Sequence, residues 1–177
     1  MHRWFGIMKL SQEEKNKLET IYQDYFHNEK ILKMKEVSMH RGSNTYIHSF
    51  RVAKLAIKRA LRRKHLDLES ILIASILHDY YLYDWRINRE MKKHHAKRHP
   101  IIAAENAKRD FDITDKVSDI IKEHMWPYNF KLFPKTKEAR IVSNADNTVA
   151  FKEAITSIAH KKKRMDKYMD GIQKLFD

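Results

Sequence analysis

The chain has 177 residues, and 36 Lys and Arg against 23 Asp and Glu give it a formal net charge of +13. This length suits one domain with a full hydrophobic core, and 3 Gly and 3 Pro against 33% charged residues favour a helical protein with few turns. Because cysteine is absent, disulfides and thiolate metal ligands are excluded.

Hydropathy and charge narrow the class of protein further. No apolar run approaches the roughly 20 residues of a membrane span, and the N-terminal stretch MHRWFGIMKL is too short and interrupted for a signal peptide. We therefore expect a soluble, cytoplasmic protein. The positive charge favours polyanionic partners such as nucleic acid or phosphorylated small molecules. However, the densest basic run, residues 161–164, is also typical of a solvated helix face.

Capping residues and apolar spacing predict helices in the first third of the chain. Ser11 and Glu14 form a capping-box pattern before a helix that ends near residues 27–28. A short helical piece is expected at 31–39, and a longer helix from about 45 to 64, capped by Ser43 or Asn44.

The most apolar stretch of the chain leads directly into a histidine and a carboxylate. Residues 71–77 are apolar apart from Ser75, follow a capping Asp67, and precede His78 and Asp79. A helix that is apolar on every side lies inside a domain, where an imidazole and a carboxylate are costly unless something satisfies them. A bound cation takes both groups as ligands, so this pair indicates a metal site.

Two interpretations remain open for the aromatic residues that follow. Tyr80, Tyr81, Tyr83 and Trp85 can be core packing at a helix end. Alternatively they form the wall of a pocket for a flat ligand such as a nucleobase, with Asp84 facing the same cleft.

The second half of the chain predicts further helices. Residues 86–98 lack an apolar stripe, so we expect a loop or lid there, followed by a helix with His99 as cap and Pro100 in its first position. Thr114 is expected to cap a helix at 115–125 that carries His124 on its apolar face. We expect the last long helix to begin near Thr136 and residues 158–177 to form an amphipathic tail. A small hairpin at 128–133 is also possible from the sequence.

Taken alone, His48 at the edge of an apolar stripe is typical of a core or boundary residue. Four motifs in order nevertheless resemble the HD superfamily of metal-dependent phosphohydrolases. They are His48-Ser-Phe-Arg51-Val-Ala53, similar to HSxRVA; Ile76-Leu-His78-Asp79, similar to LLHD; His99-Pro-x-x-Ala-Ala-Glu-Asn-Ala107, similar to HPxxGAxxA; and Ala145-Asp146, similar to the final AD. Two positions depart from the pattern: the Gly and Lys of a frequent HDIGK continuation are absent, and Ala103 stands where many relatives have Gly.

The resemblance implies a fold and a ligand set. The expected fold is all-α, one HD-type domain over residues 1–177, with a core at about 40–152 and flanking helices at both ends. The implied cofactor is one or two divalent transition-metal ions (Fe, Mn, Zn, Ni or Co). The first ion would be held by His48, His78, Asp79 and Asp146, and the second by His99, His124 and a bridging Asp79.

The remaining roles follow from chemistry beside such a metal. Arg51, one turn after His48, is a candidate for binding a phosphate oxygen, His95 for an extra ligand or a phosphate contact, and Trp85 for stacking on a base. Asp79 and Asp84 are the candidate catalytic residues, Asp84 as general acid.

We therefore expect a hydrolase that acts on a nucleotide or another small phosphorylated metabolite. The alternative is a non-catalytic basic helical module that binds nucleic acid or nucleotide through residues 59–64 and 161–164. Against it, the basic residues are dispersed over several predicted helices and no nucleic-acid motif appears.

Overall fold

The computed structural model describes residues 10–38, 44–86 and 89–173, without the side chains of Met91 and 157–173. All regular secondary structure in these ranges is helical, and an isolated antiparallel bridge joins Ser38 to Asn44. The predicted all-α class is confirmed. Among the described helices, none combines the length and hydropathy needed to cross a lipid bilayer.

The N-terminal helices begin where their caps predict. Helix α1 (Gln12–Phe26) starts with a capping box, in which the Ser11 hydroxyl accepts from the Glu14 amide at 3.1 Å and the Glu14 carboxylate accepts from the Ser11 amide at 2.8 Å. The short piece expected at 31–39 is instead α2 (Glu29–Leu32) followed by the 3-10 helix η1 (Lys33–Lys35).

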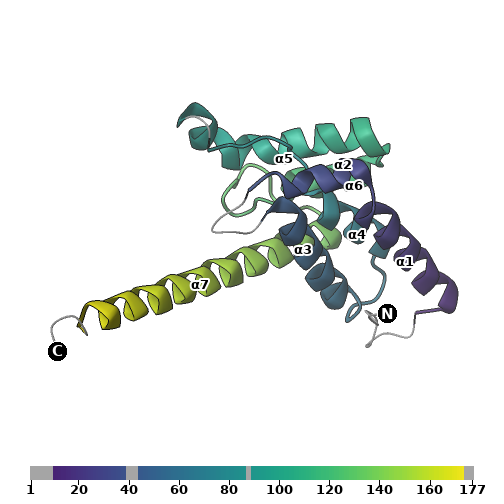
Figure 1. The fold of residues 1–177 in the computed structure, drawn as a ribbon. Helices are drawn as coiled ribbons and strands as arrows, with labels where there is room; N and C mark the ends of the chain where they lie inside the picture. The colour runs from purple at the N-terminus through teal and green to yellow at the C-terminus, as the bar shows by residue number, and fades with distance from the viewer. Residues whose placement is uncertain (1–9, 39–43, 87–88, 174–177) are drawn as a thin grey trace.

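Helices α3 and α4 form the centre of the molecule. Helix α3 (Thr45–Ala60) is capped by Asn44 and ends four residues before the predicted boundary. Helix α4 (Leu68–Leu77) is capped by Asp67, whose carboxylate accepts from the Ser70 amide at 2.9 Å. Because α4 is apolar on every side, it lies in the interior, packed against α1, α3, α6 and α7, as Figure 1 shows.

Helix α5 (Arg89–Phe111) corrects the prediction of a loop at 86–98 and a new helix at Pro100. It is continuous, and Pro100 lies inside it. The residues of its first half are mostly exposed, so they need no apolar stripe, and most of them are good helix formers. The lack of an apolar stripe in this segment therefore reflects a solvent-exposed helix and not a loop.

The C-terminal helices complete the core. Helix α6 (Asp115–Glu123) begins at the predicted cap Thr114. The hairpin left open at 128–133 does not form, since these residues are turns. Helix α7 (Lys137–Gln173) begins close to the predicted start. It continues without a break into the segment 158–177 predicted as a separate tail, of which residues 174–177 lie outside the described residues. Figure 1 shows its distal half extending away from the other helices.

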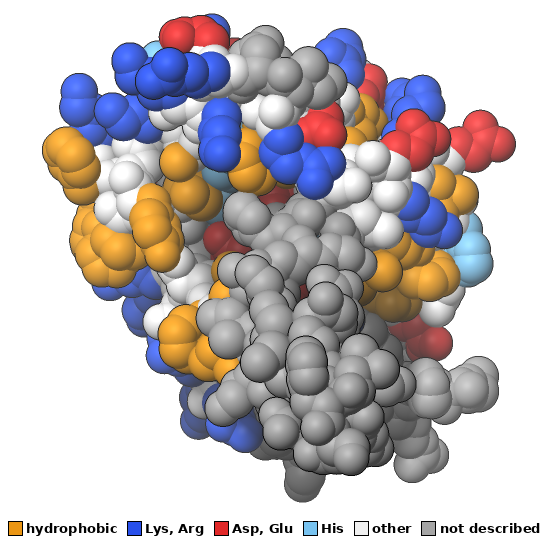
Figure 2. Space-filling view, turned by 60° about the vertical axis from the view of Figure 1, so that its left-hand side comes forward, with side chains coloured by type: hydrophobic (Ala, Val, Ile, Leu, Met, Phe, Trp, Pro, Cys, Tyr) orange, Lys and Arg blue, Asp and Glu red, His pale blue; other side chains and the backbone are white. Residues whose placement is uncertain are grey.

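Exposed apolar side chains gather outside this core. They come mainly from the α6–α7 connection and from α7, and are Trp126, Tyr128, Phe130, Phe133, Phe151 and Ile155. A cavity of about 540 Å³ lies among them, between the connection and α7. On the face drawn in Figure 2, hydrophobic side chains are grouped, whereas Lys and Arg are dispersed around them.

Candidate metal centre

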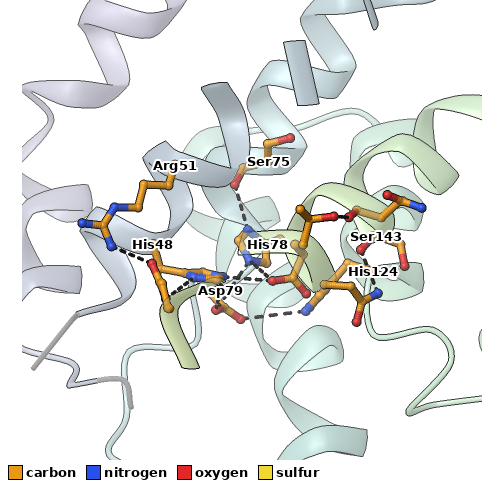
Figure 3. A network of polar contacts seen from close by, with 12 residues as sticks. His48, Arg51, Ser75, His78, Asp79, His124 and Ser143 are labelled. Carbon is orange, nitrogen blue, oxygen red and sulfur yellow. Dashed lines mark hydrogen bonds and ion pairs between the residues drawn. The ribbon is translucent and has the colours of Figure 1, made fainter. Parts of the chain in front are cut away.

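Five elements bring six ionisable side chains into one buried cluster. His48 comes from α3, His78 and Asp79 from the end of α4, and His99 from the middle of α5. His124 follows α6, and Asp146 comes from α7. All six are at most 8% exposed. Figure 3 shows His48, His78, Asp79 and His124 pointing toward one another between these helices.

The cluster has two ends, which share Asp79. At the first, the carboxylate end, His48 Nε2 lies 2.9 Å from Asp146 Oδ1, and His78 Nε2 lies 3.7 Å from the same oxygen. Asp79 Oδ2 faces this end, 3.5 Å from His78 Nε2 and 3.9 Å from His48 Nε2.

At the second, the imidazole end, two histidine rings face each other without a carboxylate of their own. His99 Nε2 lies 3.0 Å from His124 Nε2. The other oxygen of Asp79, Oδ1, lies 3.3 Å from His99 Nε2 and 3.9 Å from His124 Nε2. One carboxylate therefore touches both ends, as the bridging role predicted for Asp79 requires.

Backbone carbonyls set the tautomer of three of the rings. His78 Nδ1 donates to the Ser75 carbonyl at 2.8 Å, His99 Nδ1 to the His95 carbonyl at 2.9 Å, and His124 Nδ1 to the Ile121 carbonyl at 2.7 Å. A carbonyl only accepts, so in the neutral ring the lone pair lies on Nε2. Each Nε2 consequently points into the cluster as a ligand atom.

The converging lone pairs need a positive charge between them. His78 Nε2 is buried and has no hydrogen-bond partner among the described residues. His99 Nε2 and His124 Nε2 are two acceptors at 3.0 Å, an arrangement that is repulsive unless a proton or a cation lies between them. Three sets within the cluster have ligand atoms close enough to hold a metal ion: His48, His78 and Asp79; His78, His124 and Asp146; and Asp79, His99 and His124. The donor chemistry of the cluster thus fits a divalent ion.

The two ends differ in their electrostatics. At the carboxylate end, burial alone would lower the pKa of His48, but hydrogen bonds to Asp146 and Glu153 raise that pKa to about 10. Burial would likewise lower the pKa of His78, but the charges of Asp79 and Asp146 raise it. At the imidazole end, burial and the neighbouring His78 and His99 lower the pKa of His124 to about 3, so this ring stays neutral.

Both carboxylic acids of the cluster are ionised. Burial would raise the pKa of Asp79, but the adjacent His78, His99 and His124 hold it well below its usual range. The pKa of Asp146 is lowered in the same way by His48 and His78, against the effect of burial. Anionic oxygens and neutral imidazole nitrogens are the ligand forms that divalent transition metals take.

Glu153 is a residue of the site that the sequence analysis missed. Its Oε2 accepts from His48 Nδ1 at 3.1 Å, and its Oε1 accepts from Arg51 Nη1 at 2.8 Å. Arg51 lies at the edge of the cluster with a side chain that is 56% exposed (Figure 3). No spacing rule connects residues 48 and 153, which are 105 positions apart.

The aromatic residues after the doublet form a layer behind His99. The ring of His95 stacks on both Trp85 and His99, with centroid separations of 4.9 and 4.5 Å. Its Nδ1 is 3.0 Å from the Tyr83 hydroxyl. Tyr81 is fully packed against the same rings. The core-packing interpretation of the aromatic run is confirmed, since Tyr80 and Tyr81 are buried and Tyr83 and Trp85 are half-buried against the core. The wall of a pocket for a flat ligand stays a prediction.

Asp84 is not brought into the cluster. It pairs with Arg86 through two contacts of 2.7 and 2.9 Å, and these hydrogen bonds lower its pKa to about 2. At neutral pH the carboxylate is ionised, so the geometry gives no support to its predicted role as general acid.

Comparison with known proteins places this arrangement in a family. A family model described as HD domain matches residues 45–150, which is more than half of the chain. The match includes all six clustered residues. No curated protein and no solved structure matches the chain.

Proposed function

The chain belongs to the HD domain family, whose members are generally metal-dependent phosphohydrolases, and from this premise we propose that it hydrolyses a nucleotide or another small phosphorylated metabolite. The observation that carries the proposal is the convergence of four histidine nitrogens and two ionised carboxylates in a buried cluster. Leaving these groups without a cation would be costly.

We assign the cluster residues to two ions. His48, His78, Asp79 and Asp146 would hold one, and Asp79, His99 and His124 the other; the nitrogen and oxygen donors suit Fe, Mn, Zn, Ni or Co. When bound, such ions polarise a phosphoryl oxygen and generate a nucleophile from water at neutral pH.

The chain's own residues would place the substrate. Arg51 lies beside the carboxylate end with a side chain that is 56% exposed, and a guanidinium binds phosphate oxygens in a defined orientation. On the imidazole end, the half-buried Trp85 and Tyr83 offer aromatic surface beside the stack on His99. Flat rings next to a phosphate-binding centre suit a nucleobase, which supports a nucleotide over a sugar phosphate.

The alternative of a nucleic-acid-binding module rests on residues 59–64 and 161–164. The side chains of 161–164 lie outside the described residues. Within the first run, Arg59 Nη2 donates to the Thr148 hydroxyl on α7 at 3.0 Å. This arginine therefore contributes to the contact between α3 and α7.

Metal content and substrate preference test the proposal together. Protein purified without added metal should carry one to two ions per chain by elemental analysis. It should hydrolyse a nucleoside monophosphate, a dinucleoside polyphosphate or a cyclic nucleotide with a higher kcat/KM than a sugar phosphate. Protein that folds normally, carries no metal and gains no thermal stability on adding any of the five metals would contradict the metal assignment.

A substitution separates the nucleotide assignment from the metal assignment. Trp85→Ala should lower kcat/KM for nucleotides by about tenfold or more, since base stacking contributes about 1–3 kcal/mol, and should spare the sugar phosphate. Tyr128→Ala, which removes a 73% exposed ring outside the cluster, is the control. If kcat/KM for the sugar phosphate equals that for the nucleotides, and Trp85→Ala changes neither value, the preference for nucleotides is refuted. The metal assignment would still stand. A steep salt dependence of DNA binding without phosphatase activity would instead favour the binding module.

A further inference from the structure

One histidine of the cluster is held differently from the other three. His78, His99 and His124 donate Nδ1–H to carbonyls three or four residues earlier in their own helices. The ring of His48 donates instead to a side chain on another helix, the carboxylate of Glu153 on α7. The orientation of His48 thus depends on tertiary contact, whereas the other rings are oriented by local backbone.

Helix α7 contacts both nitrogens of the His48 ring. Asp146 and Glu153 are seven residues apart, which is about two helical turns, so they lie on the same face of α7. Asp146 Oδ1 is 2.9 Å from Nε2, and Glu153 Oε2 is 3.1 Å from Nδ1. The imidazole is therefore held between two carboxylates of α7, Asp146 within the cluster and Glu153 on the other side of the ring.

Arg51 also contacts Glu153. It follows His48 by three residues on α3, so the two side chains lie next to each other, and its Nη1 donates to the second oxygen of Glu153 at 2.8 Å. The side chain of Glu153 is 18% exposed and that of Arg51 is 56% exposed. With one carboxylate oxygen on His48 and the other on Arg51, the orientation of the Glu153 side chain is fixed by two contacts.

We infer that Glu153 is a positioning residue for the metal centre, acting through His48, with Arg51 orienting its carboxylate. Accepting the Nδ1–H sets the tautomer that leaves the His48 lone pair on Nε2, and the negative charge makes that nitrogen a stronger ligand. Within the described part of the chain, the hydrogen bonds and ion pairs of the Glu153 side chain go to His48 and Arg51. It also lies outside residues 45–150, which the family model covers. The inference rests on the proposed metal site.

Titration with Co²⁺ tests this role without reference to turnover. The affinity of each variant is measured by competition with a chelator, and the visible absorption of the bound ion reports its ligand geometry. Glu153→Ala should weaken Co²⁺ binding about 10- to 100-fold, the usual effect of losing such an outer partner, and should alter the visible bands. Glu153→Gln keeps an acceptor for Nδ1–H without the charge, so it should recover part of the affinity.

Two control variants distinguish positioning from a general structural effect. Glu138 is also on α7, and its carboxylate pairs with Lys116 and accepts from the Asp67 amide. Glu138→Ala should leave the Co²⁺ affinity within about twofold of the wild-type value. Arg51→Ala should weaken Co²⁺ binding less than Glu153→Ala, because Glu153 still reaches His48.

The outcomes separate this inference from the proposed function. If wild-type protein does not bind Co²⁺, the metal site itself is wrong. If wild type binds but Glu153→Ala binds equally well with unchanged bands, Glu153 has no positioning role. The inference also fails if Glu138→Ala loses as much affinity as Glu153→Ala, or if metal-free Glu153→Ala unfolds while Glu153→Gln matches wild type in affinity and bands.

Discussion

The carboxylate end and the imidazole end of the cluster differ in how their buried polar groups are balanced in charge. Both are buried, and both place imidazole nitrogens next to a shared Asp79. At the carboxylate end, ionised Asp146 and Asp79 can be balanced by protons on His48 and His78, whose pKa values are raised. At the imidazole end, His124 is held neutral and faces His99 at 3.0 Å.

The difference in charge predicts that the two ends bind a metal ion with different affinities. The carboxylate end has two negative charges, and a metal ion bound there would replace protons. We therefore expect its metal affinity to be the higher one and to depend on pH. The imidazole end has two ring nitrogens and only one oxygen of Asp79, so its ion should be lost first. Substitutions at the two ends test this order of loss.

Asp79→Ala should abolish activity and remove metal from both ends, because the two oxygens of this carboxylate face different ends. Turnover should fall to the background of the metal-free protein, and elemental analysis should find less than one ion per chain. Asp119→Ala, an exposed acid paired with Lys122, is the matched control. Retention of a full complement of metal in Asp79→Ala would show that the ends do not share a ligand.

His124→Ala should remove only the ion of the imidazole end. The carboxylate end keeps its ligands, so metal content should fall by about half while the protein remains folded, and the rate should drop sharply. His99→Ala should behave alike, since the two nitrogens face each other. If His124→Ala equals wild type in metal content and rate, the two-ion arrangement is wrong and a mononuclear site remains.

The stability of metal-free protein should depend on pH in the direction set by the carboxylate end. The pKa of His48 is raised to about 10 in the folded chain, above about 6.5 when unfolded. Its protonated form therefore adds stability that is complete below pH 6.5 and is lost as the pH rises toward 10. The raised pKa of His78 acts in the same direction.

Denaturant unfolding of chelator-treated protein between pH 6.5 and 9.5 measures this effect. The free energy of unfolding should fall with pH in metal-free protein and change much less in metal-loaded protein, where a cation replaces the protons. His124 has the opposite effect, and at lower pH, because its pKa is lowered to about 3 in the folded chain. The free energy of unfolding should therefore fall as the pH drops below 6.5, where the unfolded chain binds a proton that the folded chain does not. A metal-free stability that rises from pH 6.5 to 9.5 would contradict the assigned charges.

His95→Ala should have the smallest effect. The substitution keeps the backbone carbonyl that accepts from His99 Nδ1 and removes only the ring stacked on His99. Loss of that support should weaken metal binding at the imidazole end by about tenfold at most and leave the carboxylate end unchanged. His94→Ala, which removes a ring paired with Glu90, is the control. A loss of the imidazole-end ion in His95→Ala as complete as in His124→Ala would instead favour a direct ligand role for His95.

Local sequence was enough to predict most of the helix starts, although not that of α5, and to single out the candidate ligands. Ser11, Asp67 and Thr114 cap helices where their side chains predicted, because capping depends on residues within one turn. The apolar run of α4 made burial of His78 and Asp79 predictable, since a helix without a polar face has no side to expose. The ordered motifs then indicated the partners that the structure brings together.

Only the tertiary structure decided the continuity of α5, the layer of Trp85 and His95 behind His99, and the contact of Glu153 with His48. Helix α5 continues through Pro100 although local rules favour a start there. Glu153 is one of many surface-type acids in the sequence, and its role appears only because α7 packs beside α3 and brings residue 153 to residue 48. Such a contact arises from helix packing across 105 residues, for which the local pattern of side chains carries no information.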